Sequence, residues 1–304
     1  MYVTASASVA GSAATVVDFL QYCVSGLVMG LIYGLIGIGL TVIYGMMKIV
    51  NLAHGEFLML GAYLLFTFVV VVPVGFFTAL VLGLVVTMVA AFLTYQVYVR
   101  SFVAKPIITT TLATLGLAFF LRNLVLVAWG PHPQAVPSPF GTGTIALAGV
   151  SLPYTSAFAL AITVVVIGLG HAFLTRSRTG KAMRATFQNR EVAELVGVNT
   201  DRMYGLTFAL GAGLAALGGI LIAPIFAISP DMGTLAAMKA WSVTILGGMG
   251  SLPGALIAGV VLGLAESLAS GYVSSGYKEG IAFLVVVAVL LYRPHGFLGA
   301  RGRE

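Results

Sequence analysis

The sequence has 304 residues, of which 60% are hydrophobic and 8% are charged, and its formal net charge is +6. A soluble domain needs roughly 25% charged residues to cover its surface, so these values exclude a soluble fold of this length. In a bilayer, lipid-facing apolar side chains replace that polar surface. The mean hydropathy of +1.07 agrees. We predict an all-α polytopic membrane protein in which one transmembrane bundle holds nearly the whole chain.

The first 19 residues contain no Lys or Arg, so the cationic segment that opens a secretory signal peptide is missing. We therefore expect residues 1–19 to form an uncleaved tail. The single cysteine, Cys23, lies in the first apolar run, where it can build neither a disulfide framework nor a metal cluster. No metal site is expected.

Apolar stretches suited to crossing a membrane follow along the chain. A transmembrane helix needs about 20 predominantly apolar residues to cross a hydrocarbon core about 30 Å thick, and most of the runs reach that length. They cover residues 20–45, 49–72, 76–99, 107–129, 154–174, 205–228, 241–268 and 280–292. These eight runs predict a single transmembrane domain at 20–292 and a tail at 293–304.

Basic residues indicate which ends of these runs face the cytoplasm, because short cytoplasmic loops carry an excess of Lys and Arg. Twelve of the 15 Lys and Arg fall in alternate connections, whereas the segments before Phe19, around Pro73 and from Pro131 to Tyr154 carry none. We therefore predict that the N-terminal tail lies outside and that the C-terminal tail is cytoplasmic.

This orientation conflicts with eight simple spans, because eight crossings that start outside also end outside. The run 241–268 is the best candidate for a segment that does not simply cross. Glycines, Ser251 and Pro253 interrupt it between Leu246 and Gly254, so the chain can break at mid-membrane and return to the side it entered from. The preferred count is seven spans plus one re-entrant or broken segment, and eight to ten segments in all stay open.

The most polar stretch inside an apolar run is the segment 51–56, which brings together Asn51, His54, Gly55 and Glu56. Ionisable groups inside a membrane cost about 2.5–3.5 kcal/mol each, so they face protein or water rather than lipid. We take these four residues as candidates for a translocation pathway. The alternative places them at the cytoplasmic interface, with Asn51 as the N-cap of a helix and Glu56 in its first turns. A helix that starts inside the membrane would satisfy both interpretations, because its positive end faces the pathway.

A second interruption lies late in the chain, at Gly247, Gly248, Gly250 and Ser251. Two broken segments, one in each half, indicate a transporter built from internal repeats with its pathway between them, so these residues are further pathway candidates. The alternative is close helix packing, the commoner role of glycine in membrane helices. Glycines at a spacing of four predict such a packing face early in the chain: Gly26, Gly30 and Gly34.

The other charged residues near apolar runs receive simpler interpretations. Arg122 either reaches the outer interface or pairs across the bundle. Glu266 lies near a helix end and is assigned no role. Solvated loop or interface positions are expected for Asp231, Lys239, Lys278 and Glu279.

The largest polar connection, residues 175–204, carries six Lys or Arg and three acidic residues, so we predict that it is cytoplasmic. It is too short for a catalytic domain. Between Gly180 and Gly197 its apolar residues recur at helical spacing, as in a surface helix offered to a soluble partner; a merely solvated loop is the alternative. The sequence around Thr179 and Lys181 lacks the first glycine and the preceding strand of a phosphate-binding loop, so no nucleotide site is expected on this chain.

Several of these motifs together resemble one family of bacterial membrane proteins. The run from Gly26 through Tyr44 into the sequence NLAHGEF, ending at Tyr63, is similar to the signature of ABC-transporter permeases for branched-chain amino acids. The resemblance covers nearly the whole chain. It continues in the later motifs TGKAMRA (179–185), AELVGV (193–198), LGGMGSLPGALIAG (246–259) and YRPHG (292–296).

The resemblance implies an importer subunit of the bacterial cytoplasmic (inner) membrane. Its partners would be a second, homologous permease, two cytoplasmic ABC ATPases and an extracytoplasmic substrate-binding protein. ATP and Mg²⁺ would bind the ATPases, this chain would hold no cofactor, and nucleic acid would not be a partner.

The resemblance also gives the loop 175–204 a role, which is to dock into an ATPase. Glu191, Ala193 and Gly197 match the E-x-A-x-x-x-G spacing of importer coupling helices, although Val192 departs from the usual second Ala. The coupling candidates are Arg184, Glu191, Ala193, Glu194 and Gly197.

Other functions stay open at this point. Related permeases carry urea, short amides or other amino acids, and no residue here distinguishes those substrates. A different class is an autonomous channel or proton-coupled transporter that uses His54 and Glu56 as a proton relay. An intramembrane enzyme would use the same pair as acid and base, but no nucleophile, metal set or second carboxylate joins them. The prediction is therefore a transport subunit rather than an enzyme.

Overall fold

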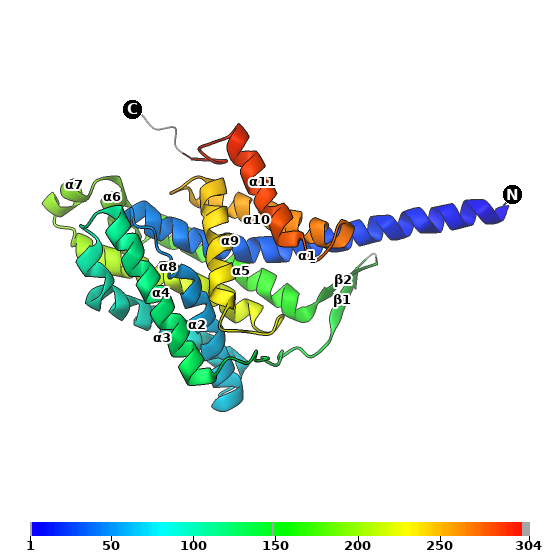
Figure 1. Ribbon diagram of the computed structural model, residues 1–304, viewed down its shortest axis with the longest axis horizontal. Helices are drawn as coiled ribbons and strands as arrows, with labels where there is room; N and C mark the ends of the chain where they lie inside the picture. The colour runs from blue at the N-terminus through cyan, green and yellow to red at the C-terminus, as the bar shows by residue number, and fades with distance from the viewer. Residues whose placement is uncertain (1, 148, 300–304) are drawn as a thin grey trace.

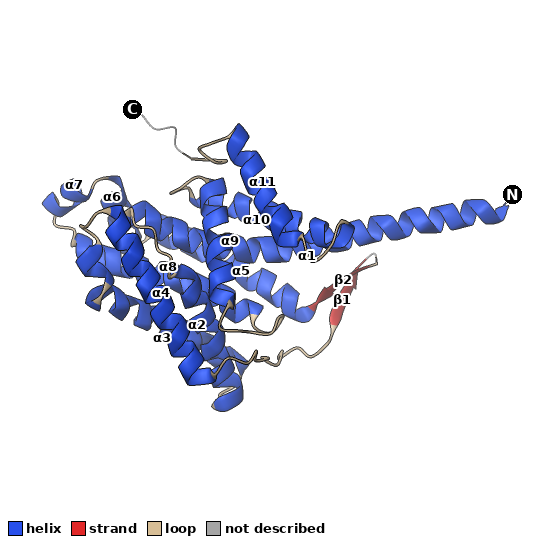
Figure 2. Cartoon of the chain, in the orientation of Figure 1, coloured by secondary structure: helices blue, strands red, loops and turns tan. Residues whose placement is uncertain are grey.

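A computed structural model describes the backbone of residues 2–147 and 149–299 and the side chains from Val16 onward (Figure 1). Most of this backbone is helical, as the composition predicts, and a small two-stranded sheet is drawn in red in Figure 2. Helices dominate because a segment in lipid must pair every backbone N–H and C=O within itself.

The helices follow the predicted apolar runs, and α1 continues through the predicted boundary between the tail 1–19 and the first span. A π-helical turn (η1, Thr67–Val71) extends α2, and a 3₁₀ turn (η2, Val99–Phe102) follows α3. The other elements in chain order are α1 (Tyr2–Met47), α2 (His54–Phe66), α3 (Phe76–Val97), α4 (Ile107–Trp129), β1 (Thr144–Leu147), β2 (Val150–Pro153), α5 (Tyr154–Arg176), α6 (Arg178–Gln188), α7 (Arg190–Leu195), α8 (Thr200–Ile222), α9 (Met232–Gly247), α10 (Leu252–Tyr272) and α11 (Lys278–Tyr292).

Seven helices among the described residues are long and apolar enough to cross a membrane. This confirms the predicted class, a polytopic helical membrane protein, whereas the orientation of its termini stays a prediction. The seven segments are Val16–Met47, His54–Val71, Phe76–Val97, Ile107–Trp129, Tyr154–Arg176, Thr200–Ile222 and Leu252–Tyr272.

The predicted break in the run 241–268 is present, and its position decides which helices can span. α9 ends at Gly247 and α10 begins at Leu252, so the break lies near the start of the run. α10 keeps 21 residues, or about 31 Å at 1.5 Å per residue, and is long enough to cross unaided. α11 has only 15 residues and is not among the seven. The seven candidate spans therefore include α10, which the sequence placed in the re-entrant or broken segment, and they leave out α11, which the sequence counted as the last span.

Helix α1 lies at the centre of the bundle, with α10, α8 and α9 packed along it (Figure 1). α10 runs antiparallel to α1, so that Gly26 faces Gly263 and Gly30 faces Gly259. A Cβ atom on Gly30 would lie 2.8 Å from the carbonyl oxygen of Gly259, which is closer than van der Waals contact allows. The packing face predicted from Gly26, Gly30 and Gly34 is confirmed, and small residues there let the two backbones touch.

The connection between α4 and α5 forms the β-hairpin. Its strands pair antiparallel, with Thr144 opposite Pro153. The Gln21 side chain of α1 donates to the carbonyl oxygen of Ser151 at 2.9 Å and accepts from its N–H at 2.8 Å. These two bonds fix the hairpin to the N-terminal part of α1.

Replacing Gly30 by Ala should destabilise the bundle, because the added Cβ would meet the α10 backbone and force the helices apart. Overpacking of this kind costs about 1–3 kcal/mol. The matched control is Gly168→Ala in α5, where an added Cβ meets nothing within 4 Å and alanine is the better helix former. The thermal midpoint of the purified protein in detergent should fall for Gly30→Ala and stay level or rise for Gly168→Ala. Equal midpoints would contradict the packing assignment.

Candidate functional site

Helix α2 begins beside α1 about three turns before the end of α1, rather than at that end. The connection 48–53 turns back along α1, starting at Lys48, which has a positive φ of 55°. The ring Nε2 of His54 lies 3.0 Å from the carbonyl oxygen of Ile36. Ile36 lies roughly 16 Å along the helix axis from Met47, where α1 ends. α2 is thus a helix that starts inside the bundle, as the pathway interpretation of 51–56 requires.

Thr114 of α4 holds this connection in place. Its hydroxyl donates to the carbonyl oxygen of Val50 at 2.9 Å and accepts from the N–H of Leu52 at 3.2 Å. The Asn51 side chain accepts from the N–H of Ala53 at 3.1 Å, which is an Asx turn. Ala53 itself precedes α2 and gives it no side-chain cap. Asn51 is therefore not the N-cap of the helix, and it shapes the connection instead.

Four polar atoms along α2 and its connection are buried without a hydrogen-bond partner in the described part of the chain. They are Asn51 Nδ2, His54 Nδ1, Glu56 Oε2 and the Tyr63 hydroxyl. An unpaired buried polar group costs on the order of 1–3 kcal/mol, so folded proteins contain few of them. The start of α2 therefore offers free donors and acceptors to water or to a polar molecule that enters.

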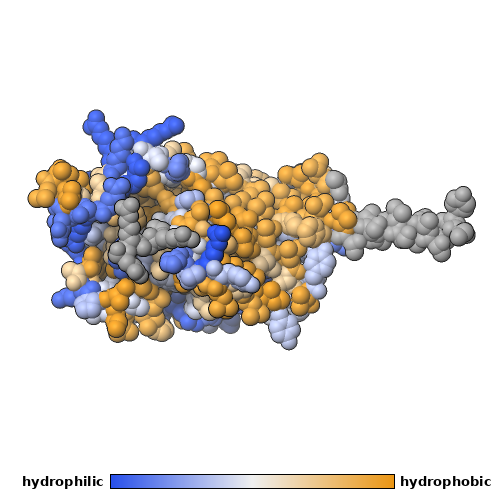
Figure 3. All heavy atoms as spheres, turned by 90° about the horizontal axis from the view of Figure 1, so that it is seen from above, coloured by the Kyte–Doolittle hydropathy of each residue, from blue (hydrophilic) through white to orange (hydrophobic). Residues whose placement is uncertain are grey.

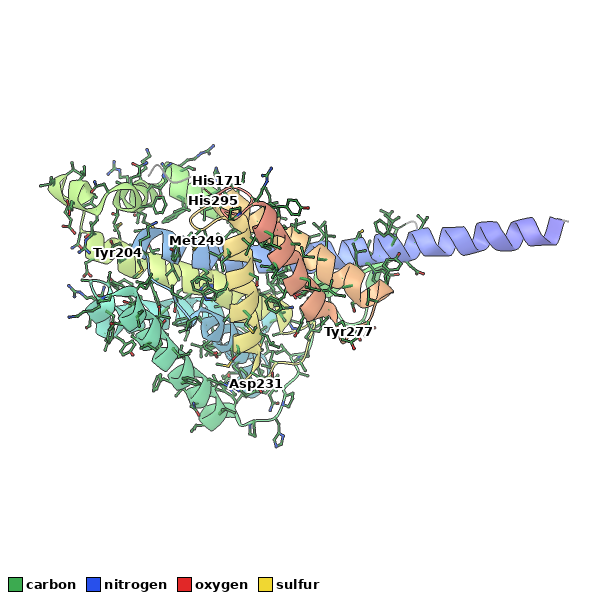
Figure 4. The ribbon with its side chains drawn as sticks, turned by 45° about the horizontal axis from the view of Figure 1, so that its top comes forward. His171, Tyr204, Asp231, Met249, Tyr277 and His295 are labelled. Carbon is green, nitrogen blue, oxygen red and sulfur yellow. The ribbon has the colours of Figure 1, made fainter. Side chains whose placement is uncertain are left out.

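The first turn of α9 packs against the first turn of α2. Gly55 and Gly233 meet backbone against backbone, and the Glu56 carboxylate lies over Gly233, so no side chain fits at either glycine. Asp231, which precedes α9 (Figure 4), forms an ion pair with Arg122 of α4. Arg122 thus has a charged partner on another segment, and the pair lies at the exposed edge of the bundle, since the Asp231 side chain is 69% exposed.

The glycines and the serine at 247–251 are explained by the turn between α9 and α10. Ser251 caps α10 by accepting a hydrogen bond from the N–H of Gly254 at 3.2 Å. Gly248 and Gly250 have φ values of 93° and 95°, a conformation that glycine adopts without strain. These residues end one helix and start the next within a few positions.

The same turn lies at the end of the bundle. The carbonyl oxygen of Gly247 accepts from the N–H of Leu298 at 3.1 Å, and Gly250 faces the ring of Phe187 in α6. His54 lies instead beside Ile36, about three turns before the end of α1. The structure therefore does not bring the two sets of pathway candidates together.

The predicted cytoplasmic connection forms two short helices, α6 and α7. Each begins at a side-chain cap. Ser177 accepts from the N–H of Gly180 at 2.8 Å, and Asn189 accepts from the N–H of Val192 at 3.1 Å. The helical pattern predicted across 180–197 is confirmed, with a break at Asn189 that divides it.

Among the coupling candidates, Glu194 ties α7 to α8. Its carboxylate accepts from the Thr200 hydroxyl at 2.5 Å and from Arg190 Nε at 2.9 Å. These hydrogen bonds, that from Thr200 first, hold the pKa of the Glu194 carboxyl below its ordinary value of 4.5. The resulting stabilisation is present above the ordinary pKa and is lost as the pH falls through the lowered one. At neutral pH, Glu194 is a fixed link within the loop.

The other coupling candidates differ in exposure. Ala193 is 1% exposed and therefore faces the protein interior, and Gly197 follows the helix with a φ of 82°. Arg184 Nη2 donates to the carbonyl oxygen of Thr175 at 3.3 Å. Glu191 is exposed and is therefore available to a partner.

Helix α7 also exposes apolar side chains. Val192, Leu195 and Val196 are 54%, 85% and 73% exposed. Figure 3 shows hydrophilic residues gathered at the end of the molecule that carries α6 and α7, beside a small apolar patch. An apolar patch within a polar rim is typical of a protein-docking surface.

A second polar cluster, which the sequence did not predict, lies between α1, α9 and α10. Lys239 Nζ donates to the Tyr33 hydroxyl and to Glu266 Oε2, both at 2.8 Å, and the Tyr33 hydroxyl donates to Glu266 Oε2 at 2.9 Å. The Lys239 and Glu266 side chains are only 17% and 9% exposed, so the expectation of a solvated Lys239 is wrong. Glu266 lies within an apolar run and Lys239 lies two residues before it. Ionisable groups in such places pair inside the bundle, and that signal could have marked each residue, although not its partner.

A larger hollow of about 600 Å³ lies between α1, α3, α5, α8 and α10. Its lining is almost entirely apolar, and His171 is the one ionisable residue among the described side chains that line it. α5 leaves much of its apolar surface uncovered there; Leu169, for example, is 64% exposed. This hollow suits apolar groups such as lipid chains or another helix rather than a charged molecule.

Comparison with known proteins places the chain among membrane transport proteins. A family model described as branched-chain amino acid transport system / permease component matches residues 22–290. The high-affinity branched-chain amino acid transport system permease protein LivH of Escherichia coli strain K12 is 35% identical over 303 residues, covering 92% of this chain and 96% of that protein. With the same coverage, LivH of Salmonella typhimurium is 34% identical and BraD of Pseudomonas aeruginosa is 33% identical. The chain therefore belongs to the family of branched-chain amino acid transport system permease components.

Proposed function

We propose that this chain is the membrane-spanning permease subunit of an ATP-driven importer in the bacterial cytoplasmic (inner) membrane, and that its cargo is a branched-chain amino acid. The observation that carries the proposal is the similarity to LivH and BraD over 92% of the chain. Those relatives are named as permease proteins of high-affinity branched-chain amino acid transport systems.

The importer requires three kinds of partner. A second, homologous permease completes the pathway, two cytoplasmic ATPases bind ATP and Mg²⁺, and an extracytoplasmic protein delivers the substrate. The exposed Leu195 and Val196 on α7 support the ATPase contact, since an apolar helix face suits a groove on a soluble partner. Because the ATPases supply the energy for transport, this chain needs no nucleotide site and no catalytic residue of its own.

Two contacts connect the coupling loop to the transmembrane helices. Glu194 of α7 accepts from Thr200 of α8, and Phe187 of α6 packs on Gly45 of α1. α1 and α8 in turn pack on each other, and α8 packs on α2. When the ATPases close on ATP, a displacement of α6 and α7 is transmitted along α1 and α8 and switches access to the buried polar groups at the start of α2.

Purification of the tagged chain from its native membranes tests the proposal. We expect two ATPase subunits and a second permease to copurify. In liposomes supplied with ATP and the binding protein, the complex should accumulate labelled leucine. Unlabelled valine and isoleucine should compete with it, whereas urea and acetamide should not.

Two outcomes would redirect the assignment. Competition by urea or acetamide would move the cargo to amides. Transport by the purified chain alone, driven by a proton gradient, would favour the autonomous class in which His54 and Glu56 relay protons, and it would overturn the importer.

Replacing Leu195 by Asp should weaken ATPase docking. Burying a leucine contributes about 1.5–3 kcal/mol, so its loss should lower the affinity on the order of 10- to 100-fold. Copurified ATPase and uptake should both fall, while the amount of chain in the membrane stays unchanged. The matched control is Leu147→Asp on β1, a leucine that is 77% exposed and lies far from α7 (Figure 1). Wild-type ATPase recovery with Leu195→Asp would rule out α7 as the docking surface.

A further inference from the structure

A cavity of about 130 Å³ lies where α9, α10 and α11 meet. A single water molecule requires about 10–15 Å³ of such space, so this cavity has room for a molecule of several non-hydrogen atoms. Its wall combines three charged side chains with an apolar lining. The lining residues that matter here are Lys239, Glu266, Glu279, Leu235, Met238 and Phe283.

The charged side chains of the wall include one hydrogen-bond donor and one carboxylate that are not paired within the described part of the protein. An ammonium group has three N–H donors, and the bonds of Lys239 to Tyr33 and Glu266 use two of them. Glu279 in the first turn of α11 takes part in none of the ion pairs found among the described residues. One donor and one carboxylate are therefore open to a ligand.

We infer that this cavity is a binding site for the α-amino acid cargo, an inference that rests on the proposed function. The ligand carboxylate accepts from the free N–H of Lys239, its ammonium donates to Glu279, and its aliphatic side chain contacts the apolar lining. A zwitterion brings a matching charge for each of these groups, so no charge is buried unpaired on binding. Ionisable residues within membrane segments commonly mark such substrate routes.

The chemistry of the larger apolar hollow argues against that hollow as the substrate site. His171 is its only ionisable lining residue among the described positions, so a zwitterion would leave at least one of its charges without a partner. Desolvating an unpaired charge is strongly unfavourable. Of the two hollows, the one lined by Lys239 and Glu279 matches the ligand at both of its charged ends.

Cysteine protection tests the site directly in the complete, detergent-purified importer. With Cys23→Ser removing the native thiol of this chain, Met238→Cys places a thiol in the cavity lining. Leucine should slow its modification by N-ethylmaleimide at least severalfold. The matched control is Met249→Cys, since Met249 has similar exposure, 53% against 48% for Met238, but lies in the turn 248–251 outside the cavity. Its modification rate should not respond to leucine.

The charge requirement is tested with the same readout. Glu279→Gln should raise the leucine concentration that gives half-maximal protection about tenfold or more, the size expected for losing a charge-assisted hydrogen bond. Asp18→Asn, which removes an exposed carboxylate from α1, should leave it unchanged. 3-Methylbutylamine and 4-methylpentanoate each lack one charge of leucine, and each should protect at least tenfold more weakly.

The two proposals fail in different ways. If the importer accumulates leucine with ATP but leucine does not protect the Met238→Cys position, the site is overturned and the proposed function stands. Equal protection by leucine and by both singly charged analogues would also overturn zwitterion recognition. If the complex moves no leucine, the proposed function itself fails. Even if Glu279→Gln prevents assembly, protection at the Met238→Cys position still decides the question.

Discussion

The backbone contact between α1 and α10 is the constraint on which the rest of the bundle depends. With glycine at the facing positions, carbonyl groups of one helix lie against Cα atoms of the other, and no larger residue fits. α9 joins α10 through the short turn at 248–251, so it too is fixed against α1. Side chains then bridge these helices, as in the hydrogen bond of 3.3 Å between Thr41 and Thr244. Apolar side chains cannot supply this specificity in lipid, because the lipid tails are as apolar as they are.

Polar residues gather around α9, a short helix packed against α1, α2 and α10. At its start, Asp231 pairs with Arg122, and Glu56 lies over Gly233. About two turns later, Lys239 joins Tyr33 and Glu266. With 16 residues, α9 falls below the length of about 20 that favours a full span. A helix of this kind is held by partners within the protein rather than by lipid, and its charged side chain, Lys239, is paired inside the bundle.

The sequence predicted the elements well because the membrane imposes one rule on every span, about 20 apolar residues with paired backbones. It also predicted a helix that starts near His54 inside the bundle and a surface helix around residues 180–197. What it could not predict was pairing between distant helices. Lys239 and Glu266 lie on α9 and α10 and meet through Tyr33 of α1, and no local pattern reveals which faces turn toward each other.

The other errors arose where one sequence pattern is compatible with two local structures. An asparagine before a helix can cap it or close an Asx turn, because both use the same side-chain oxygen. For Asn51 the tertiary contact of Thr114 with the connection decides in favour of the turn. Similarly, a glycine-interrupted run can be one re-entrant pair or a short helix followed by a full span. The position of the break near Gly248 decides this, since it leaves α10 long enough to cross.

The packing around His54 links the pathway candidates to the loop 175–204. A Cβ atom on Gly39 of α1 would lie 2.5 Å from the carbonyl oxygen of Gly211 in α8 and 3.1 Å from Cε1 of His54. The imidazole therefore lies directly beside the place where α1 and α8 touch. These two helices also contact the loop: α1 meets Phe187 of α6 at Gly45, and α8 contacts Glu194 of α7 at Thr200. Close-packed helices transmit displacement instead of absorbing it, so a shift of α1 against α8 at the loop changes the space around His54.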